Sequence, residues 1–256
     1  MPAYDERVIR EYNRLWESLQ IKPDKLNKVQ ALALSLEANK QRYLAVSTQT
    51  GVPWYVIGLI HLRECSSRFD RHLHNGDPLT ARTKRVPPNR PEKGKPPFTW
   101  EESALDAIRL LNLHQWHDWS ISGIAYVLER YNGFGYRRRS ISIKSPYLWS
   151  WSNHYTRGKF DRDSHYNENM VDAQPGCMVI LYHMAFTKLI PLQAQGHPCF
   201  IYNPAVKHHR IELLQEFLNS NCNAGLKVDG YAGRGTSEAV MKAFGNYMIG
   251  DPRGAK

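Results

Sequence analysis

The chain has 256 residues, of which 42% are hydrophobic and 23% charged, a composition close to the globular average that excludes wholesale disorder. Its length corresponds to one large domain, or to one medium domain and a small module. The longest apolar stretch, at residues 56–60, is far short of the ~20 residues that a spanning helix requires, which excludes stable membrane insertion. Thirty-four Lys and Arg residues against 24 Asp and Glu residues give a charge of +10, which favours nucleic acid, anionic lipid or an anionic bacterial envelope as partner.

The first 16 residues are charged and lack the apolar segment of a signal peptide. We therefore expect synthesis in the cytoplasm, and export, where it occurs, by another route. The four cysteines are widely spaced and form no CxxC pair, which argues against a zinc or redox motif. Pairing of Cys199 with Cys177 or with Cys222 stays open at this stage.

Helical periodicity dominates the first half of the chain. Tyr12, Leu15, Trp16 and Leu19 predict a first helix that ends before Pro23. The pattern over residues 32–43 predicts a second helix, and an almost wholly apolar run over residues 54–64 predicts a buried third one.

Residues 67–98 read as irregular, because an Asn-Gly-Asp-Pro turn at 75–78 precedes a basic, proline-rich segment at 82–97. Thr99 begins a capping box and a helix through Leu113, and another helix is predicted over residues 121–130. A glycine- and aromatic-rich region follows at 131–160, and helical periodicity resumes over residues 171–189. We predict a mainly α fold without a large sheet.

The C-terminal part reads as a separate helical module. A Pro- and Gly-containing linker is predicted at 191–204, between a first domain at 1–190 and a module at 205–256. Within the module, residues 211–218 form an amphipathic helix, Asp229-Gly230 forms a tight turn, and Thr236 caps a helix over residues 237–244.

Glu64 is the candidate catalytic residue, because it stands at the end of the apolar third helix. A carboxyl group in apolar surroundings has its charged form disfavoured and its pKa raised, as a general acid for glycosidic cleavage requires near neutrality. The alternative is a structural glutamate that pairs with Arg63 or Arg68.

Two segments in this order resemble those of goose-type lysozymes and soluble lytic transglycosylases. Glu64-Cys65-Ser66-Ser67-x-Phe69 is similar to the Glu-Ser-x-x-Phe segment of that group, displaced by one position. Tyr131-Asn132-Gly133 is similar to its Tyr-Asn-x-Gly segment, with the second glycine at 135. The wider stretch from about 40 to 250 resembles lysozyme-like proteins of the endolysin type.

The resemblance implies a lysozyme-like helical domain in which Glu64 is the acid and Tyr131 and Asn132 position the sugar. The segment from Leu214 to Val240, with its Asp-Gly turn, resembles the small three-helix peptidoglycan-binding domain, although it lacks the usual closing Phe-Gln. The implied activity is cleavage of the β-1,4 bond between N-acetylmuramic acid and N-acetylglucosamine in peptidoglycan.

An inverting hydrolase also needs a second carboxylate to activate water, and Asp77 is the first candidate for this base, with Glu129 as the second. A lytic transglycosylase needs only the one glutamate and leaves a 1,6-anhydro end. Tyr136, Tyr147 and Trp149 are candidates to stack on sugar rings, with core packing as their alternative. We expect neither a metal nor an organic cofactor.

Two further functions remain as alternatives. The chain could bind the cell wall without catalysis, or it could bind nucleic acid through the basic runs at 82–97 and 137–139. No helix-turn-helix or RNA-recognition signature is present, so we do not expect a nucleic-acid partner. We expect a monomer that reaches the wall through a holin or another route and binds glycan strands and the anionic envelope.

Overall fold

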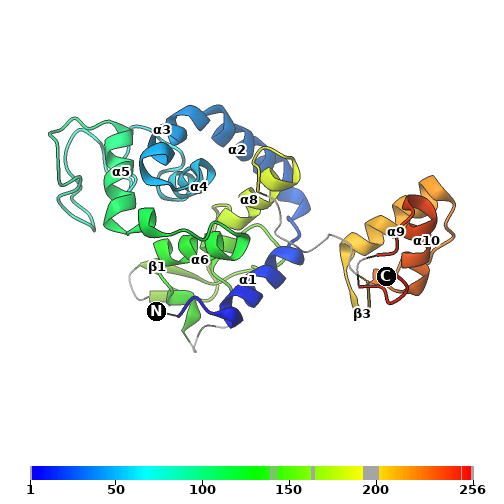
Figure 1. Ribbon diagram of the computed structural model, residues 1–256. Helices are drawn as coiled ribbons and strands as arrows, with labels where there is room; N and C mark the ends of the chain where they lie inside the picture. The colour runs from blue at the N-terminus through cyan, green and yellow to red at the C-terminus, as the bar shows by residue number, and fades with distance from the viewer. Residues whose placement is uncertain are drawn as a thin grey trace. The chain divides into compact units, whose positions relative to one another are not determined.

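The computed structural model describes residues 2–138, 141, 143–162, 165–192, 202–248 and 250–254. Over these residues the protein is mainly helical, with two small two-stranded sheets (Figure 1). The chain divides into two compact units, residues 1–193 and 194–256, each with its own apolar core. No helix among the described residues is long and apolar enough to cross a membrane.

The first unit contains eight α-helices and one sheet within the described residues. The helices are α1 (Glu6–Glu17), α2 (Leu26–Ala38), α3 (Lys40–Thr50), α4 (Trp54–Cys65), α5 (Trp100–Leu110), α6 (Ile121–Asn132), α7 (Pro146–Trp149) and α8 (Cys177–Phe186). Three single 3-10 turns lie at Pro23–Lys25, Leu113–Gln115 and Gly135–Arg137. Strands β1 (Lys159–Arg162) and β2 (His165–Asn167) pair antiparallel.

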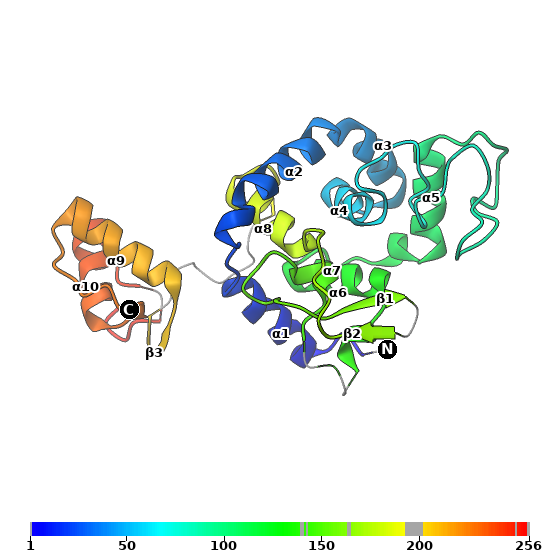
Figure 2. The ribbon, with the colours of Figure 1, turned by 180° about the vertical axis from the view of Figure 1, so that it is seen from behind.

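Helix α4 forms the centre of this unit. Every residue of the helix except Arg63 and Glu64 is buried. It contacts α2, α3, α6 and α8, and both ribbon views show it enclosed by these neighbours (Figure 2). Helices α1 and α6 pack on each other and complete the core. The prediction of a buried third helix is therefore confirmed, and burial of its apolar face is the main stabilising contribution.

The second predicted helix is in fact two. It breaks at Asn39, whose side-chain amide donates to the carbonyl oxygen of Ser35 and so competes with the next helical turn. The capping box at Thr99 is confirmed, since its hydroxyl accepts from the Glu102 amide and the Glu102 carboxylate accepts from the Thr99 amide. That helix ends at Leu110, three residues earlier than predicted.

The predicted helix over 171–189 is wrong at its beginning. Helix α8 starts only at Cys177, because Gly176 is extended and its amide donates to the Ser150 carbonyl oxygen. Only glycine fits at this position, since an added Cβ would stand 2.3 Å from the Leu148 carbonyl oxygen. Asp172, one of the residues expected in the helix, is instead buried in a loop and accepts hydrogen bonds from Arg63 and Lys159.

The second unit consists of β3 (Asn203–Lys207), α9 (His209–Cys222), β4 (Tyr231–Ala232) and α10 (Arg234–Phe244). Strands β3 and β4 pair antiparallel. Gly230 adopts a positive φ of 77°, which confirms the predicted turn at Asp229-Gly230. The predicted cap is wrong, since α10 begins at Arg234, and Thr236 lies inside the helix and donates to the Tyr231 carbonyl oxygen.

Cys65 and Cys177 are buried free thiols, and Cys222 is an exposed one. Cys199 lies outside the described residues, as does most of the predicted linker.

Candidate functional site

Glu64 lies in the last turn of α4, where the chain leaves the core. Ser66 and Ser67 follow with φ values of 52° and 57°, in the left-handed region that non-glycine residues seldom adopt. The Ser66 amide donates to the Leu62 carbonyl oxygen and the Ser67 amide to that of His61, which ends the helix. This turn leaves Glu64 half-buried at the end of a buried helix.

The environment of Glu64 favours the protonated carboxyl. Burial raises the pKa of Glu64 to about 7, and the hydrogen bond from Tyr147 and the charge of Arg63 oppose only part of this effect. The Tyr147 hydroxyl donates to Oε1 at 3.0 Å. Near neutral pH the group therefore exchanges a proton readily, which is the property that general acid–base chemistry needs.

Neither neighbouring arginine forms an ion pair with Glu64. Arg63 Nη2 binds Oδ2 of Asp172 at 2.7 Å and its Nη1 donates to the Pro175 carbonyl oxygen. Arg68 binds Asp70 at 2.7 Å. Among the described residues, Glu64 has no salt bridge, and the structural reading of this glutamate as a partner of Arg63 or Arg68 does not hold.

The Arg63–Asp172 pair fixes the surroundings of Glu64, and sequence reasoning missed its acidic member. Both side chains are nearly inaccessible, at 6% and 1% exposure, and the Arg63 guanidinium also lies 4.8 Å from the Tyr147 ring centre. Burial alone would raise the pKa of Asp172, but Arg63 and further hydrogen bonds outweigh it and lower that pKa. No local motif signals this pair, because its members are 109 residues apart.

Tyr131 and Tyr147 lie near Glu64, and Asn132 lies at the C-terminal end of α6. The Glu64 charge contributes to raising the pKa of each tyrosine, after the larger effect of burial. The Tyr131 hydroxyl donates to the Leu73 carbonyl oxygen at 3.0 Å. Asn132 is exposed at the last position of α6, immediately before Gly133, whose φ is 87°.

Asp77, the first candidate for a second carboxylate, accepts hydrogen bonds from residues of its own loop. Its carboxylate accepts from the backbone amides of Lys84 and Arg85 and from Nε of Arg85. Burial alone would raise the pKa of Asp77, but these hydrogen bonds lower it to about 2. Such a carboxylate is a weak base near neutral pH, and its contacts explain instead how the basic loop is anchored.

Glu129, the second candidate, also accepts hydrogen bonds from side chains of the protein. It accepts from the Tyr12 hydroxyl at 2.5 Å and from Nε of Arg137 at 2.9 Å. Burial raises the pKa of Glu129, although Arg137 and Tyr12 oppose the shift. These contacts join α1 to α6 and account for Glu129 as a structural residue.

The other aromatic candidates lie in the interior. Trp149 is 1% exposed and contacts the His154 ring edge to face. Tyr136 is 7% exposed, and its hydroxyl accepts from the Phe160 amide. Both residues line a surface hollow of about 280 Å³, but little of either side chain is exposed, so we leave both out of the proposed sugar contacts.

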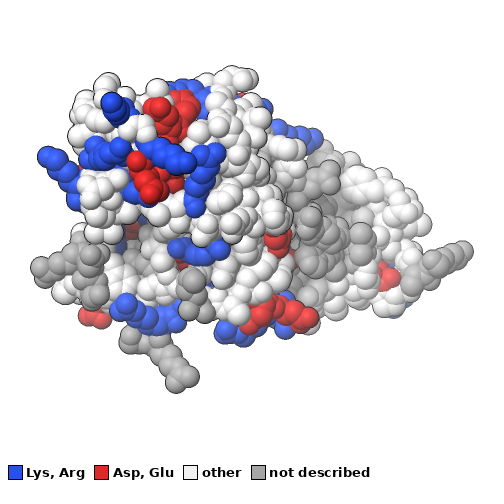
Figure 3. All heavy atoms as spheres, turned by 60° about the vertical axis from the view of Figure 1, so that its left-hand side comes forward, with Lys and Arg blue, Asp and Glu red and all other residues white. Residues whose placement is uncertain are grey.

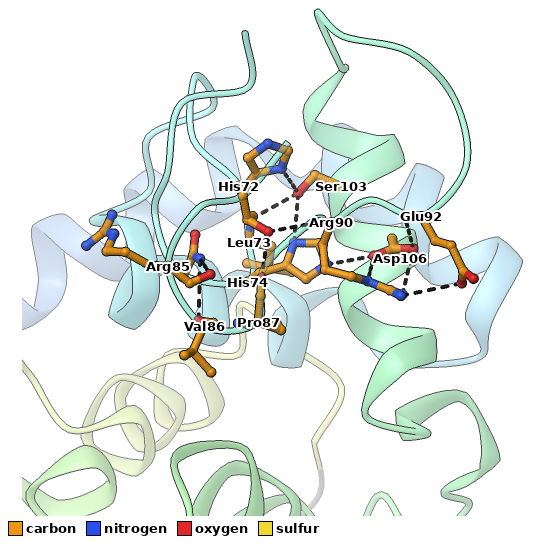
Figure 4. A network of polar contacts seen from close by, with 12 residues as sticks. His72, Leu73, His74, Arg85, Val86, Pro87, Arg90, Glu92, Ser103 and Asp106 are labelled. Atoms are coloured by element: carbon orange, nitrogen blue, oxygen red, sulfur yellow. Dashed lines mark hydrogen bonds and ion pairs between the residues drawn. The ribbon is translucent and has the colours of Figure 1, made fainter. Parts of the chain in front are cut away.

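A polar network holds the basic loop against α5 (Figure 4). The Ser103 hydroxyl is hydrogen-bonded to Nδ1 of His72 at 2.9 Å, and Nε2 of His74 is hydrogen-bonded to the Asp106 carboxylate at 2.8 Å. Arg90, from the far part of the loop, binds the same carboxylate. Ser103 is fully buried, so this serine, histidine and aspartate have a structural role.

Two well-formed surface hollows lie among the described residues of the first unit, and Glu64 lines neither of them. One, of about 480 Å³, lies between α5 and residues 90–94. The other, of about 280 Å³, is lined by Glu129, Tyr136 and Trp149 together with Glu11 and Arg137, among others. Within the described part of the chain, no group of three or more His, Cys, Asp or Glu side chains is placed to hold a metal ion.

Comparisons of the chain with known proteins found no similar one. No family model matches the chain, and neither a curated protein nor a solved structure matches it.

Proposed function

We propose that the chain is a lysozyme-like glycosidase that cleaves the β-1,4 bond between N-acetylmuramic acid and N-acetylglucosamine in peptidoglycan. The observation that carries the proposal is the Glu64 carboxyl, which is held by Tyr147 at the end of a buried helix with a pKa of about 7. A protonated carboxyl of this kind can donate to the leaving glycosidic oxygen. The sequence resemblance around Glu64 and Tyr131 supplies the substrate class.

Each neighbouring group has a role in this proposal. Glu64 protonates the leaving oxygen, and Tyr147 orients its carboxyl through the 3.0 Å hydrogen bond. Arg63 holds the Tyr147 ring in place and is itself fixed by Asp172. Asn132, exposed at the end of α6, is the group that would contact the sugar. Positioned proton donors suffice for such cleavage, so the proposed reaction needs no cofactor.

A second candidate function is a lytic transglycosylase, which needs no second carboxylate. This function is favoured because the two candidate bases, Asp77 and Glu129, already accept hydrogen bonds from groups within the protein. In that reaction Glu64 first acts as acid and then as base, while a hydroxyl of the sugar closes a 1,6-anhydro ring. The two reactions share the same acid and differ in their product.

The test is digestion of purified sacculi with the full chain, with the released fragments weighed by mass spectrometry. We expect glycan fragments from the wild type and none from Glu64→Gln. Glu168→Gln is the matched control, because Glu168 is exposed in the turn after β2 and should leave release unchanged. Reducing ends would identify a hydrolase and anhydro ends a transglycosylase. Equal release by wild type and Glu64→Gln would contradict the role of Glu64 as the acid, and no release by either would contradict the proposal and favour a non-catalytic wall-binding protein.

A further inference from the structure

The larger surface hollow lies on the first unit, between one face of α5 and residues 90–94. Its α5 side consists of Glu102, Leu105, Asp106, Arg109 and Leu110, which recur at the spacing of one helix face. The volume of about 480 Å³ lies within the range of ligand pockets. Figure 3 shows acidic and basic side chains interspersed on the side of the molecule where α5 and its preceding loop come forward.

The acidic side chains of the hollow already face donors within the protein. Asp106 accepts from Arg90, His74 and the Glu92 amide. Glu102 accepts from the Thr99 amide and hydroxyl. Glu92 pairs with Arg90 at 3.4 Å, and Figure 4 shows Arg90 between Asp106 and Glu92.

The remaining cations of the hollow are Lys93 and Arg109. Both side chains are exposed, and neither has a salt bridge or side-chain hydrogen bond among the described residues. The lining contains three acidic and three basic residues, so its formal charge is zero, but each acidic side chain is held by donors within the protein whereas Lys93 and Arg109 have no such partner among the described residues. A ligand that carries carboxylates would complete these two positions with charge-assisted hydrogen bonds.

Two leucines give the lining of the hollow an apolar part. Leu105 is packed against the core, and Leu110 is 39% exposed. A small apolar group, such as the methyl group of an alanine, could pack against these leucines, whereas a polyol phosphate chain carries no such group. The hollow therefore combines sites for carboxylates with an apolar contact.

We propose that this hollow binds the peptide stem of peptidoglycan through Lys93 and Arg109, beside α5. The proposal names a second part of the substrate and rests on the proposed function only for the choice of this peptide. Short stem peptides carry both free carboxylates and alanine methyl groups, which match the two features of the hollow.

The probe is the soluble tetrapeptide L-Ala-γ-D-Glu-L-Lys-D-Ala, titrated into the full chain by calorimetry. This peptide has no glycosidic bond, so its binding is independent of Glu64 chemistry and of fragment release from sacculi. We expect the wild type to bind it, and the double variant Lys93→Gln/Arg109→Gln to bind about tenfold or more weakly. The same peptide with both carboxylates amidated should bind the wild type as weakly as the double variant binds the acid.

The matched control is Arg7→Gln/Lys28→Gln, which removes the same charge from exposed positions on α1 and α2. It should retain wild-type affinity, because a loss there would reflect net charge alone. The proposal is overturned if the wild type does not bind the tetrapeptide, if the amidated peptide binds equally, or if the double variant matches the wild type. Tighter binding of polyglycerol phosphate than of the tetrapeptide, abolished by the double variant, would overturn it in favour of a phosphate polymer.

Discussion

The Tyr147 hydroxyl donates a 3.0 Å hydrogen bond to Oε1 of Glu64, although the two residues are 83 positions apart. The contact joins the one-turn helix α7 to the end of the central helix α4. It stabilises the ionised form of a carboxyl whose burial favours the neutral form. The balance of these two effects sets the proton affinity on which the proposed chemistry depends.

Replacing Glu64 by glutamine should make the stability of the protein less sensitive to alkali. The folded pKa of about 7 exceeds the ordinary 4.5, so the contribution of this group is present below pH 4.5 and is lost as the pH rises through 7. Between pH 4 and pH 8, the wild type should therefore lose about 3 kcal/mol of its free energy of unfolding relative to Glu64→Gln. Urea denaturation at both pH values measures this, with Glu168→Gln as the control. A constant difference between wild type and Glu64→Gln would show that the carboxyl is not desolvated.

Tyr147→Phe should move the titration of Glu64 to higher pH. The lost hydrogen bond stabilised the carboxylate, so its removal raises the pKa further above 7, by about one unit or less. The alkaline limb of fragment release should shift in the same direction, and carbon NMR of the Glu64 carboxyl checks the pKa independently of activity. Tyr126→Phe, which loses a hydrogen bond to the Pro2 carbonyl oxygen, should leave both unchanged. A downward shift in Tyr147→Phe would contradict the assignment.

Asp172→Asn should destabilise the first unit strongly. The variant leaves the buried Arg63 guanidinium without its ionised partner, and breaking such a pair costs about 3–5 kcal/mol. Urea denaturation at pH 7 measures the change. Asp24→Asn removes an exposed partner of Lys25 and should leave the free energy of unfolding almost unchanged, because solvent screens such a pair. Similar effects of the two substitutions would mean that the Arg63–Asp172 pair is not desolvated.

Gln215→Ala should loosen the second unit alone. The Gln215 side-chain oxygen accepts from the amides of Asp229 and Gly230, and its nitrogen donates to Thr236 and to the Tyr231 carbonyl oxygen. Loss of this buried amide should destabilise the unit by about 2–4 kcal/mol.

Hydrogen exchange with mass spectrometry locates the effect of Gln215→Ala. Amides at 229–237 should exchange faster, while those of α4 stay protected. Asn221→Ala, an exposed change on the same helix, should leave both segments as in the wild type. Faster exchange in α4 would show that the two units do not unfold independently.

Local patterns predicted much of the secondary structure, because they depend on residues close in sequence. The apolar run over 54–64 predicted a buried helix, and Thr99 and Glu102 predicted a capped one, since each signal lies within a few turns. The predicted helix over 171–189 failed at its beginning because tertiary contacts hold that segment, among them the Gly176 amide with the Ser150 carbonyl oxygen and Asp172 with Arg63.

For the candidate site, the sequence alone determined that Glu64 ends an apolar helix and lies beside two arginines. Only the tertiary structure decided that Arg63 forms an ion pair with Asp172 and that Tyr147 donates a hydrogen bond to Glu64. It also decided that Asp77 forms an ion pair with Arg85. The physical reason is that a carboxyl group's pKa and its availability depend on burial and on which charges lie within a few ångströms. For Asp172 and Tyr147, those neighbours come from segments more than 80 residues away.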